Sequence, residues 1–182
     1  ELLEELEFRT LSKRILGEEP SEPVQGELFA VESHDAPTPD MYKTILDVEH
    51  DYQLIQTKEE CLSLIELLKS EKQYCFDTET SDLNTFTCNL VGLSFSFKKG
   101  TGYYVHLPQE RNDALAILDL FQPIFSDKNK TLIGHNIKFD LKVMRQYGID
   151  LKNNLFDTMI AHYLLHPDGK HGMDDVSEKL LC

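Results

Sequence analysis

The stretch from residue 74 to residue 80 constrains the fold most, because an apolar run there ends in two carboxylates. The first three residues are aromatic or apolar and predict a buried strand. Asp77 and Glu79 follow at spacing i, i+2, so both point to the same face of that strand. Like charges held this close repel each other unless a positive charge lies between them. Because hard divalent cations prefer carboxylate oxygens, the pair indicates a metal site and phosphoryl transfer on nucleic acid.

A second acidic position follows a short apolar strand predicted at residues 131–134. Apolar side chains then recur at helical spacing, at Ile137, Leu141 and Met144. Asn136 is the expected N-cap, and Asp140 lies on the same side of the first helical turn, directed toward the end of the strand. Two simpler interpretations stay open. The acids at 77 and 79 can merely end a strand, and Asp140 can merely offset the helix dipole.

The charge distribution bears on the expected partners. The net charge is −14, whereas nucleic-acid binders normally present a basic face. Residues 1–50 hold thirteen acids and four bases, and residues 51–182 hold the remaining nineteen acids and fourteen bases. A divalent ion would neutralise part of the second excess. The acidity therefore lowers the expected affinity of this chain alone for DNA, but it does not argue against the chemistry.

Composition also divides the chain. Residues 1–16 have an amphipathic helical pattern, and residues 17–41 form an acidic, proline-rich linker that precedes a domain at 42–182. No apolar run is long enough to span a membrane, and no secretory signal is visible. The four cysteines lack paired short spacing, which fits a reducing cytoplasm.

Inside the domain, strands precede an alternation of strands and helices, which favours an α/β fold with a mixed sheet flanked by helices. Thr57 and Glu60 predict a capping box at the start of one helix. Its expected apolar side comprises Leu62, Ile65, Leu67 and Leu68. A single helix is predicted from Asn112 to Ser126, and Asp157 is expected to cap a helix that ends at Leu165.

Four segments, taken together and in this order, resemble the 3′–5′ proofreading exonuclease domain of bacterial family A DNA polymerase I. They are Phe76-Asp77-Thr78-Glu79-Thr80, Asn89-Leu90-Val91-Gly92-Leu93-Ser94-Phe95, Gly134-His135-Asn136-Ile137-Lys138-Phe139-Asp140 and Phe156-Asp157-Thr158-Met159. Residues 1–8 resemble the end of the 5′-nuclease domain of that polymerase. The resemblance covers the whole chain and is strongest from residue 74 onward.

The resemblance implies a ribonuclease-H-like fold and DEDD-type catalysis with two Mg²⁺ ions, for which Mn²⁺ can substitute. By the resemblance, Asp77 bridges both ions, Glu79 binds the ion that carries the attacking water, and Asp140 supports the second ion. The family takes its fourth acid from a later Tyr-x-x-x-Asp segment, which does not occur here. We therefore expect a C-terminally incomplete domain that is weakly active or inactive by itself.

The resemblance also implies contacts with the 3′ end of single-stranded DNA. The expected substrate-binding residues are Thr80, Leu83, His135, Asn136 and Lys170. Further expected partners are the polymerase and 5′-nuclease domains of the same full-length chain. Two alternatives remain: a non-catalytic scaffold module of the polymerase, and a related RNA 3′-processing exonuclease.

Overall fold

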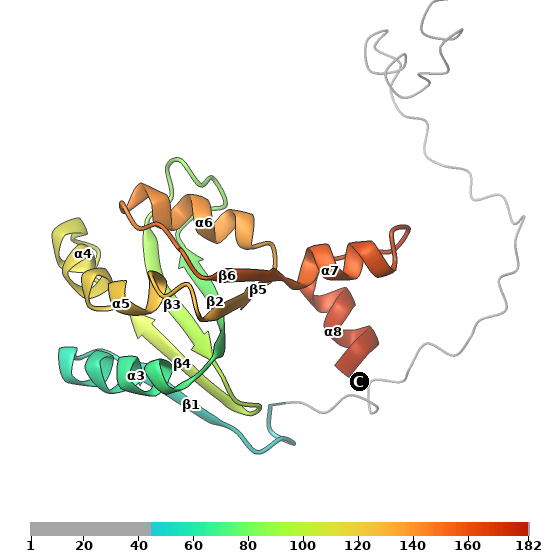
Figure 1. The fold of residues 1–182 in the computed structure, drawn as a ribbon, viewed down its shortest axis with the longest axis horizontal. Coiled ribbons are helices and arrows are strands. Elements are labelled where there is room, and N and C mark those ends of the chain that lie inside the picture. Colours follow the sequence, from blue (N-terminus) through green and yellow to red (C-terminus); the bar gives the residue numbers. More distant parts are fainter. Residues whose placement is uncertain (1–44, 182) are drawn as a thin grey trace, which may run out of the picture. The chain divides into compact units, whose positions relative to one another are not determined.

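A computed structural model describes residues 45–181, which all lie in one compact unit. The helix predicted at residues 1–16 and the linker predicted at 17–41 lie outside the described residues. Within this part of the chain, one mixed sheet has the strand order β1-β4-β3-β2-β5-β6 (Figure 1). The strands are β1 Asp51–Ile55, β2 Gln73–Thr80, β3 Leu90–Ser96, β4 Thr101–His106, β5 Thr131–Gly134 and β6 Asn154–Asp157.

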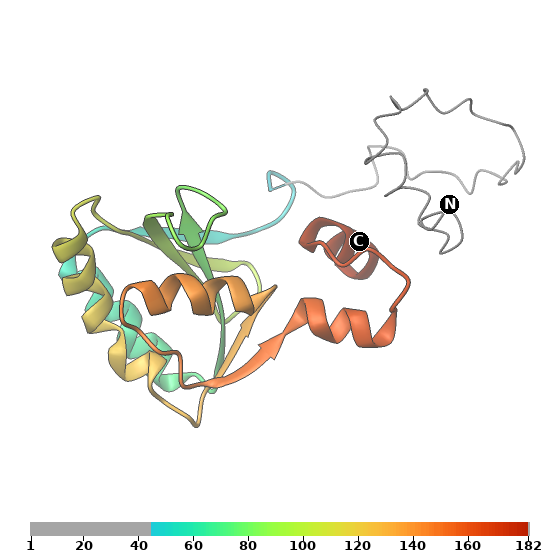
Figure 2. The same ribbon diagram turned by 90° about the horizontal axis from the view of Figure 1, so that it is seen from above.

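The middle of the sheet is antiparallel, since β3 pairs in that sense with both β2 and β4. The outer pairings are parallel: β1 with β4, β5 with β2, and β6 with β5. The helices are α3 Lys58–Ser70, α4 Arg111–Leu120, α5 Gln122–Phe125, α6 Ile137–Gln146, α7 Thr158–Leu165 and α8 Met173–Leu181. Figures 1 and 2 show α3, α4 and α5 gathered together, whereas α7 and α8 lie at the far end of the sheet. The predicted α/β fold with a mixed, helix-flanked sheet is confirmed.

The alternation of side chains along β2 gives the sheet two different faces. Tyr74, Phe76 and Thr78 are buried, whereas Cys75, Asp77 and Glu79 are not. The buried side chains pack into an aromatic core under α3, α4 and α5. Its rings are Tyr74, Phe76, Phe95, Phe121 and Phe125. We call the other side, which carries Asp77 and Glu79 of β2, Ser94 of β3 and Tyr104 of β4, the open face.

The start of α3 is as the sequence predicts, but its buried side is rotated. Thr57 and Glu60 form the capping box, with Thr57 Oγ1 accepting from the Glu60 amide. The buried residues of α3 are Cys61, Leu64, Ile65 and Leu68. Leu62 and Leu67, predicted on the apolar side, are about half exposed because they lie off this i, i+3, i+4, i+7 row.

The helix predicted from Asn112 to Ser126 is interrupted. It consists of α4 and the short α5, which are separated at Phe121. Pro123 lies near the start of α5, where its missing N–H costs no helical hydrogen bond. The strand β6 was not predicted, because an edge strand of four residues has too short a pattern. Among residues 45–181, no helix combines the length and apolar character needed to cross a membrane.

Candidate active site

Asp77 and Glu79 lie on the open face of β2, as the sequence predicts. Each is paired across the sheet with a small residue of β3, since Asp77 lies opposite Ser94 and Glu79 opposite Gly92. Burial raises the pKa of the Asp77 carboxyl, and the negative charge of Glu79 raises it further. Among residues 45–181, the ion pairs that join side chains lie elsewhere, so no lysine or arginine neutralises this pair.

Asp140 reaches the edge of β2 from the first turn of α6. The pairing of β2 with β5 ends at Cys75 and Ile133, which leaves the following part of β2 without a strand on that side. Asp140 Oδ1 occupies this edge, where it accepts from the backbone N of Thr78 at 2.9 Å and from Thr78 Oγ1 at 2.6 Å. Thr78 is a site residue that the sequence reasoning missed, and its position between two acids gives no local signal of this contact.

Asp140 is almost completely enclosed, with 1% of its surface exposed. Burial raises the pKa of its carboxyl from 3.8 to about 6. The hydrogen bonds from Thr78 work in the opposite direction, because they favour the charged form, and the negative charge of Asp77 adds to the rise. A buried acid whose protonation depends on a second acid nearby is typical of a functional site.

Asp157 fixes the starts of two helices at once. Its Oδ1 accepts from the Met159 and Ile160 amides at the start of α7, which confirms its predicted capping role. The same carboxylate also accepts from the amides of Asn136 at 3.1 Å and Ile137 at 2.9 Å, at the start of α6. Asp157 therefore holds the helical turn that carries Asp140.

Asn136 occupies the N-cap position of α6, but its side chain makes no capping hydrogen bond. Its backbone is left-handed, with φ of 63°, the one positive φ of a non-glycine residue among those described. Asparagine tolerates this conformation better than most residues do. The prediction that Asn136 is the N-cap residue of α6 is confirmed, and the amides of Asn136 and Ile137 at this helix start donate to Asp157.

His135 is held by the protein through both ring nitrogens. Its Nδ1 lies 2.9 Å from Thr158 Oγ1, and its Nε2 lies 2.8 Å from the backbone oxygen of His171. Since a carbonyl oxygen only accepts, Nε2 carries a proton. His135 lowers the pKa of Asp77 through its charge, so it is close to the acidic pair. This packing links α7 and the segment after it to the open face.

The other predicted substrate-binding residues lie near the surface. Thr80 is the last residue of β2, and its Oγ1 donates to the backbone oxygen of Asp82, in the loop that follows, at 2.9 Å. Leu83, in the same loop, is 86% exposed. The Lys170 ammonium lies 3.8 Å from Asp175 and is also largely exposed. The structure places Thr80 and Leu83 just beyond the acids of β2, and Lys170 between α7 and α8.

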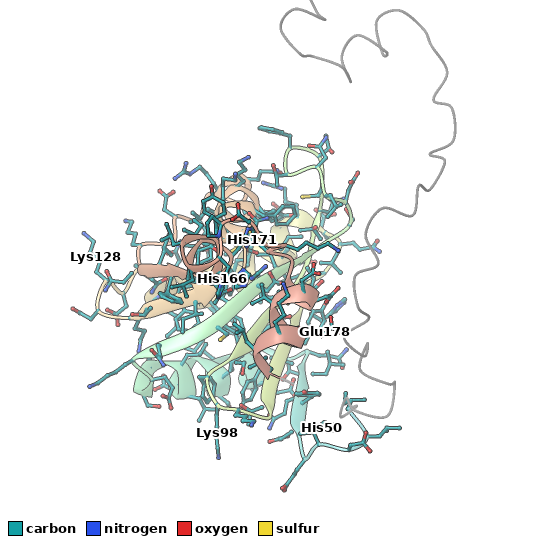
Figure 3. The ribbon with its side chains drawn as sticks, turned by 90° about the vertical axis from the view of Figure 1, so that its right-hand side faces the viewer. His50, Lys98, Lys128, His166, His171 and Glu178 are labelled. Atoms are coloured by element: carbon teal, nitrogen blue, oxygen red, sulfur yellow. The ribbon has the colours of Figure 1, made fainter. Side chains whose placement is uncertain are left out.

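Three histidines gather where α7 meets the segment before α8, and Figure 3 labels two of them, His166 and His171. His162 Nδ1 lies 2.8 Å from His171 Nδ1, and the His162 and His166 rings are 5.1 Å apart. In the first pair one ring nitrogen donates a hydrogen bond to the other. Across residues 45–181, no three side chains of His, Cys, Asp or Glu are grouped to hold one metal ion. The neighbouring acids Asp77, Glu79 and Asp140 likewise do not form a three-ligand cage.

A cavity of about 1110 Å³ lies between the open face and helices α7 and α8. Asp77, Tyr104 and His135 line it on the side of the sheet. Apolar side chains of the two helices, among them Leu165 and Leu180, line the other side. A largely apolar hollow with a few convergent polar groups is the usual form of a binding site.

The fold defines a structural class, the ribonuclease-H-like fold, which solved structures share. The catalytic core of RRP6 from Trypanosoma brucei matches with a TM-score of 0.61 and 20% identity, over 77% of this chain and 36% of that chain. Escherichia coli RNase D, an exoribonuclease involved in structured RNA processing, matches with a TM-score of 0.57 and 20% identity. The match covers 72% of this chain and 34% of that chain. Brucella melitensis NrnC with bound Mg²⁺ matches with a TM-score of 0.56 and 21% identity, over 74% of this chain and 62% of that chain. At 20–21% sequence identity, these matches show that this chain shares their fold.

Sequence relatives define the family. The sequence model of a 3′–5′ exonuclease family matches residues 52–182. DNA polymerase I of Borreliella burgdorferi is 37% identical over 180 residues, which cover 96% of this chain and 19% of that protein. DNA polymerase I of Pseudomonas aeruginosa is 28% identical over 148 residues, which cover 76% of this chain and 16% of that protein. The chain belongs to the 3′–5′ exonuclease family of DNA polymerase I. It spans about a fifth of the length of these relatives.

Proposed function

We propose that this chain is the proofreading module of a DNA polymerase, which removes nucleotides from the 3′ end of single-stranded DNA. Membership of the 3′–5′ exonuclease family supports the reaction type. The observation that carries the proposal is the pair Asp77 and Glu79 on the open face, next to the buried Asp140. In a longer polypeptide, residues 42–182 would form the exonuclease domain between 5′-nuclease and polymerase domains.

The donor chemistry of the site fits hard divalent cations, Mg²⁺ first and Mn²⁺ as a substitute. Two carboxylates share one strand face, and the negative charge of Glu79 raises the cost of ionising Asp77, so a cation there relieves repulsion. Asp77 and Glu79 would hold the ions directly, and Asp140 would support one of them through water. When bound, two ions would supply an activated water and stabilise the leaving 3′ oxygen.

The protein's own residues then position the substrate. Asp157 holds the start of α6, and the Asn136 side chain makes no capping hydrogen bond, so it is available for the terminal nucleotide. The exposed Leu83 next to the acids offers an apolar surface on which an unpaired base can pack. His135 would help to hold this arrangement, because protein groups already engage both of its ring nitrogens.

The test is degradation of 5′-labelled single-stranded DNA by the 182-residue chain, with Mg²⁺ or Mn²⁺. We expect slow shortening from the 3′ end, because the family's Tyr-x-x-x-Asp segment does not occur in this sequence. Asp77→Ala should abolish the shortening and Mn²⁺ binding, whereas the exposed Asp119→Ala should change neither. DNA shortening that persists in Asp77→Ala would refute the proposed site. Faster loss of RNA than of DNA of the same sequence would support the RNA-processing alternative instead.

A further inference from the structure

The Tyr104 ring lies directly over Gly92 on the open face. A Cβ atom added to Gly92 would come within 2.3 Å of the Tyr104 hydroxyl oxygen and 2.4 Å of Cζ. Such distances are far below van der Waals contact, so a side chain at position 92 and this position of the ring exclude each other. A glycine inside a strand weakens the strand and commonly marks a place of close approach. Gly92 is that place, because it makes room for the phenol.

The strand register puts this hydroxyl beside Glu79. Gly92 is the cross-strand partner of Glu79, and Tyr104 itself pairs with Ser94. The Tyr104 ring therefore extends from the Ser94–Tyr104 pair toward the neighbouring Glu79–Gly92 pair. Cross-strand neighbours on one face are within reach of each other's side chains. A phenol keeps its proton near neutral pH, so the Tyr104 hydroxyl can donate a hydrogen bond.

Glu79 lacks the support that Asp140 has. Asp140 is buried and receives two hydrogen bonds from Thr78. Glu79 is exposed, and among residues 45–181 no hydrogen bond or ion pair holds its carboxylate. A flexible side chain loses conformational entropy when it becomes a ligand, which weakens binding. A hydroxyl fixed next to it by packing would reduce that loss.

We propose that Tyr104 is a positioning residue for Glu79. Its hydroxyl donates to the Glu79 carboxylate when a divalent cation binds, and Gly92 provides the space for this. The inference rests on the proposed function, since it assigns a partner to one of the proposed metal ligands. Groups that orient metal ligands in this way contribute about 10- to 100-fold in metal affinity or activity.

The test measures Mn²⁺ affinity of the full 182-residue chain by calorimetry, with shortening of single-stranded DNA as a second measurement. Tyr104→Phe should weaken Mn²⁺ binding by about tenfold or more, lower kcat and leave KM for DNA nearly unchanged. Gly92→Ala should have the same effect with the hydroxyl retained, because the added Cβ displaces the ring. Combining the two changes should add nothing, since both remove one interaction.

Tyr103→Phe is the matched control, because it removes a hydroxyl from the next residue of β4 on the buried face. It should leave the affinity for Mn²⁺ unchanged. Thermal unfolding of each variant separates a lost contact from a damaged fold. Wild-type affinity in a folded Tyr104→Phe protein would overturn this inference while the proposed function stands. Absence of any Asp77-dependent Mn²⁺ binding in the wild-type chain would refute the proposed function, and this inference with it.

Discussion

Replacing Asp140 by asparagine should stabilise the metal-free protein while it destroys the proposed site. The carboxyl is 1% exposed, and burial raises its pKa from 3.8 to about 6. In the Asp140→Asn variant the amide oxygen can still accept both hydrogen bonds from Thr78, so the change removes the charge but keeps the contacts. The gain is the free energy of ionising the buried acid. A rise of about two pKa units corresponds to about 3 kcal/mol.

The direction of this pH dependence follows from the linkage between proton binding and folding. Because the folded-state pKa of Asp140 is raised, the folded protein binds this proton more tightly than the unfolded chain does. The stabilisation from the proton is therefore complete below 3.8 and is lost as the pH rises through about 6. The Asp140→Asn variant does not lose stability in this way, because an amide does not ionise. We expect the variant to match the wild type near pH 4 and to exceed it by about 3 kcal/mol at pH 8.

Urea unfolding with EDTA, repeated from pH 4 to pH 8, measures this difference. In thermal unfolding at pH 8, the melting temperature should rise by roughly 6–12 °C for a chain of this size. Asp119→Asn, which removes an exposed acid from α4, is the control and should stay within about 0.5 kcal/mol at every pH. A variant less stable than the wild type at pH 8 would refute the reasoning, as would a difference that is the same at pH 4 and pH 8.

Two further predictions concern the ends of α3. Thr57→Ala removes the capping box and should lower the free energy of unfolding, measured with urea, by about 1 kcal/mol. Ser63→Ala, on the exposed side of the same helix, is the control and should not lower it. Equal effects of the two changes would contradict this prediction. Lys130 is buried and donates to the backbone oxygens of residues 69 and 71, so Lys130→Met should cost about 1–3 kcal/mol in the same measurement. The exposed Lys128→Met is its control, and a comparable loss there would rule out the proposed role.

The parts of the site that depend on local periodicity could be predicted from the sequence. The period of two along β2 places Asp77 and Glu79 on one face, and the helical spacing after Asn136 puts Asp140 in a first turn. The capping box at Thr57 is equally local, because four consecutive residues contain both partners. Each of these features needs only a few neighbouring residues to define it.

The remaining parts depend on long-range pairing. Asp140 meets Thr78 because the pairing of β5 with β2 stops at Cys75, and no local pattern defines where pairing stops. The contact of Tyr104 with Gly92 joins two strands through a register that only the folded sheet sets. A sequence signal did exist for this contact, namely a glycine between apolar strand residues. Its meaning depends on which side chain lies opposite.

The carboxylate of Asp157 has a consequence for comparing members of this family. Both of its oxygens accept backbone amides. Oδ1 accepts from Met159 and Ile160 of α7 and also from Asn136, and Oδ2 accepts from Ile137 of α6. An amide side chain offers one acceptor oxygen instead of two, so asparagine cannot replace the acid without leaving an amide unpaired. Selection would therefore retain aspartate here for architectural reasons. An acid beside the candidate site is therefore not, by its position alone, evidence of a role in hydrolysis.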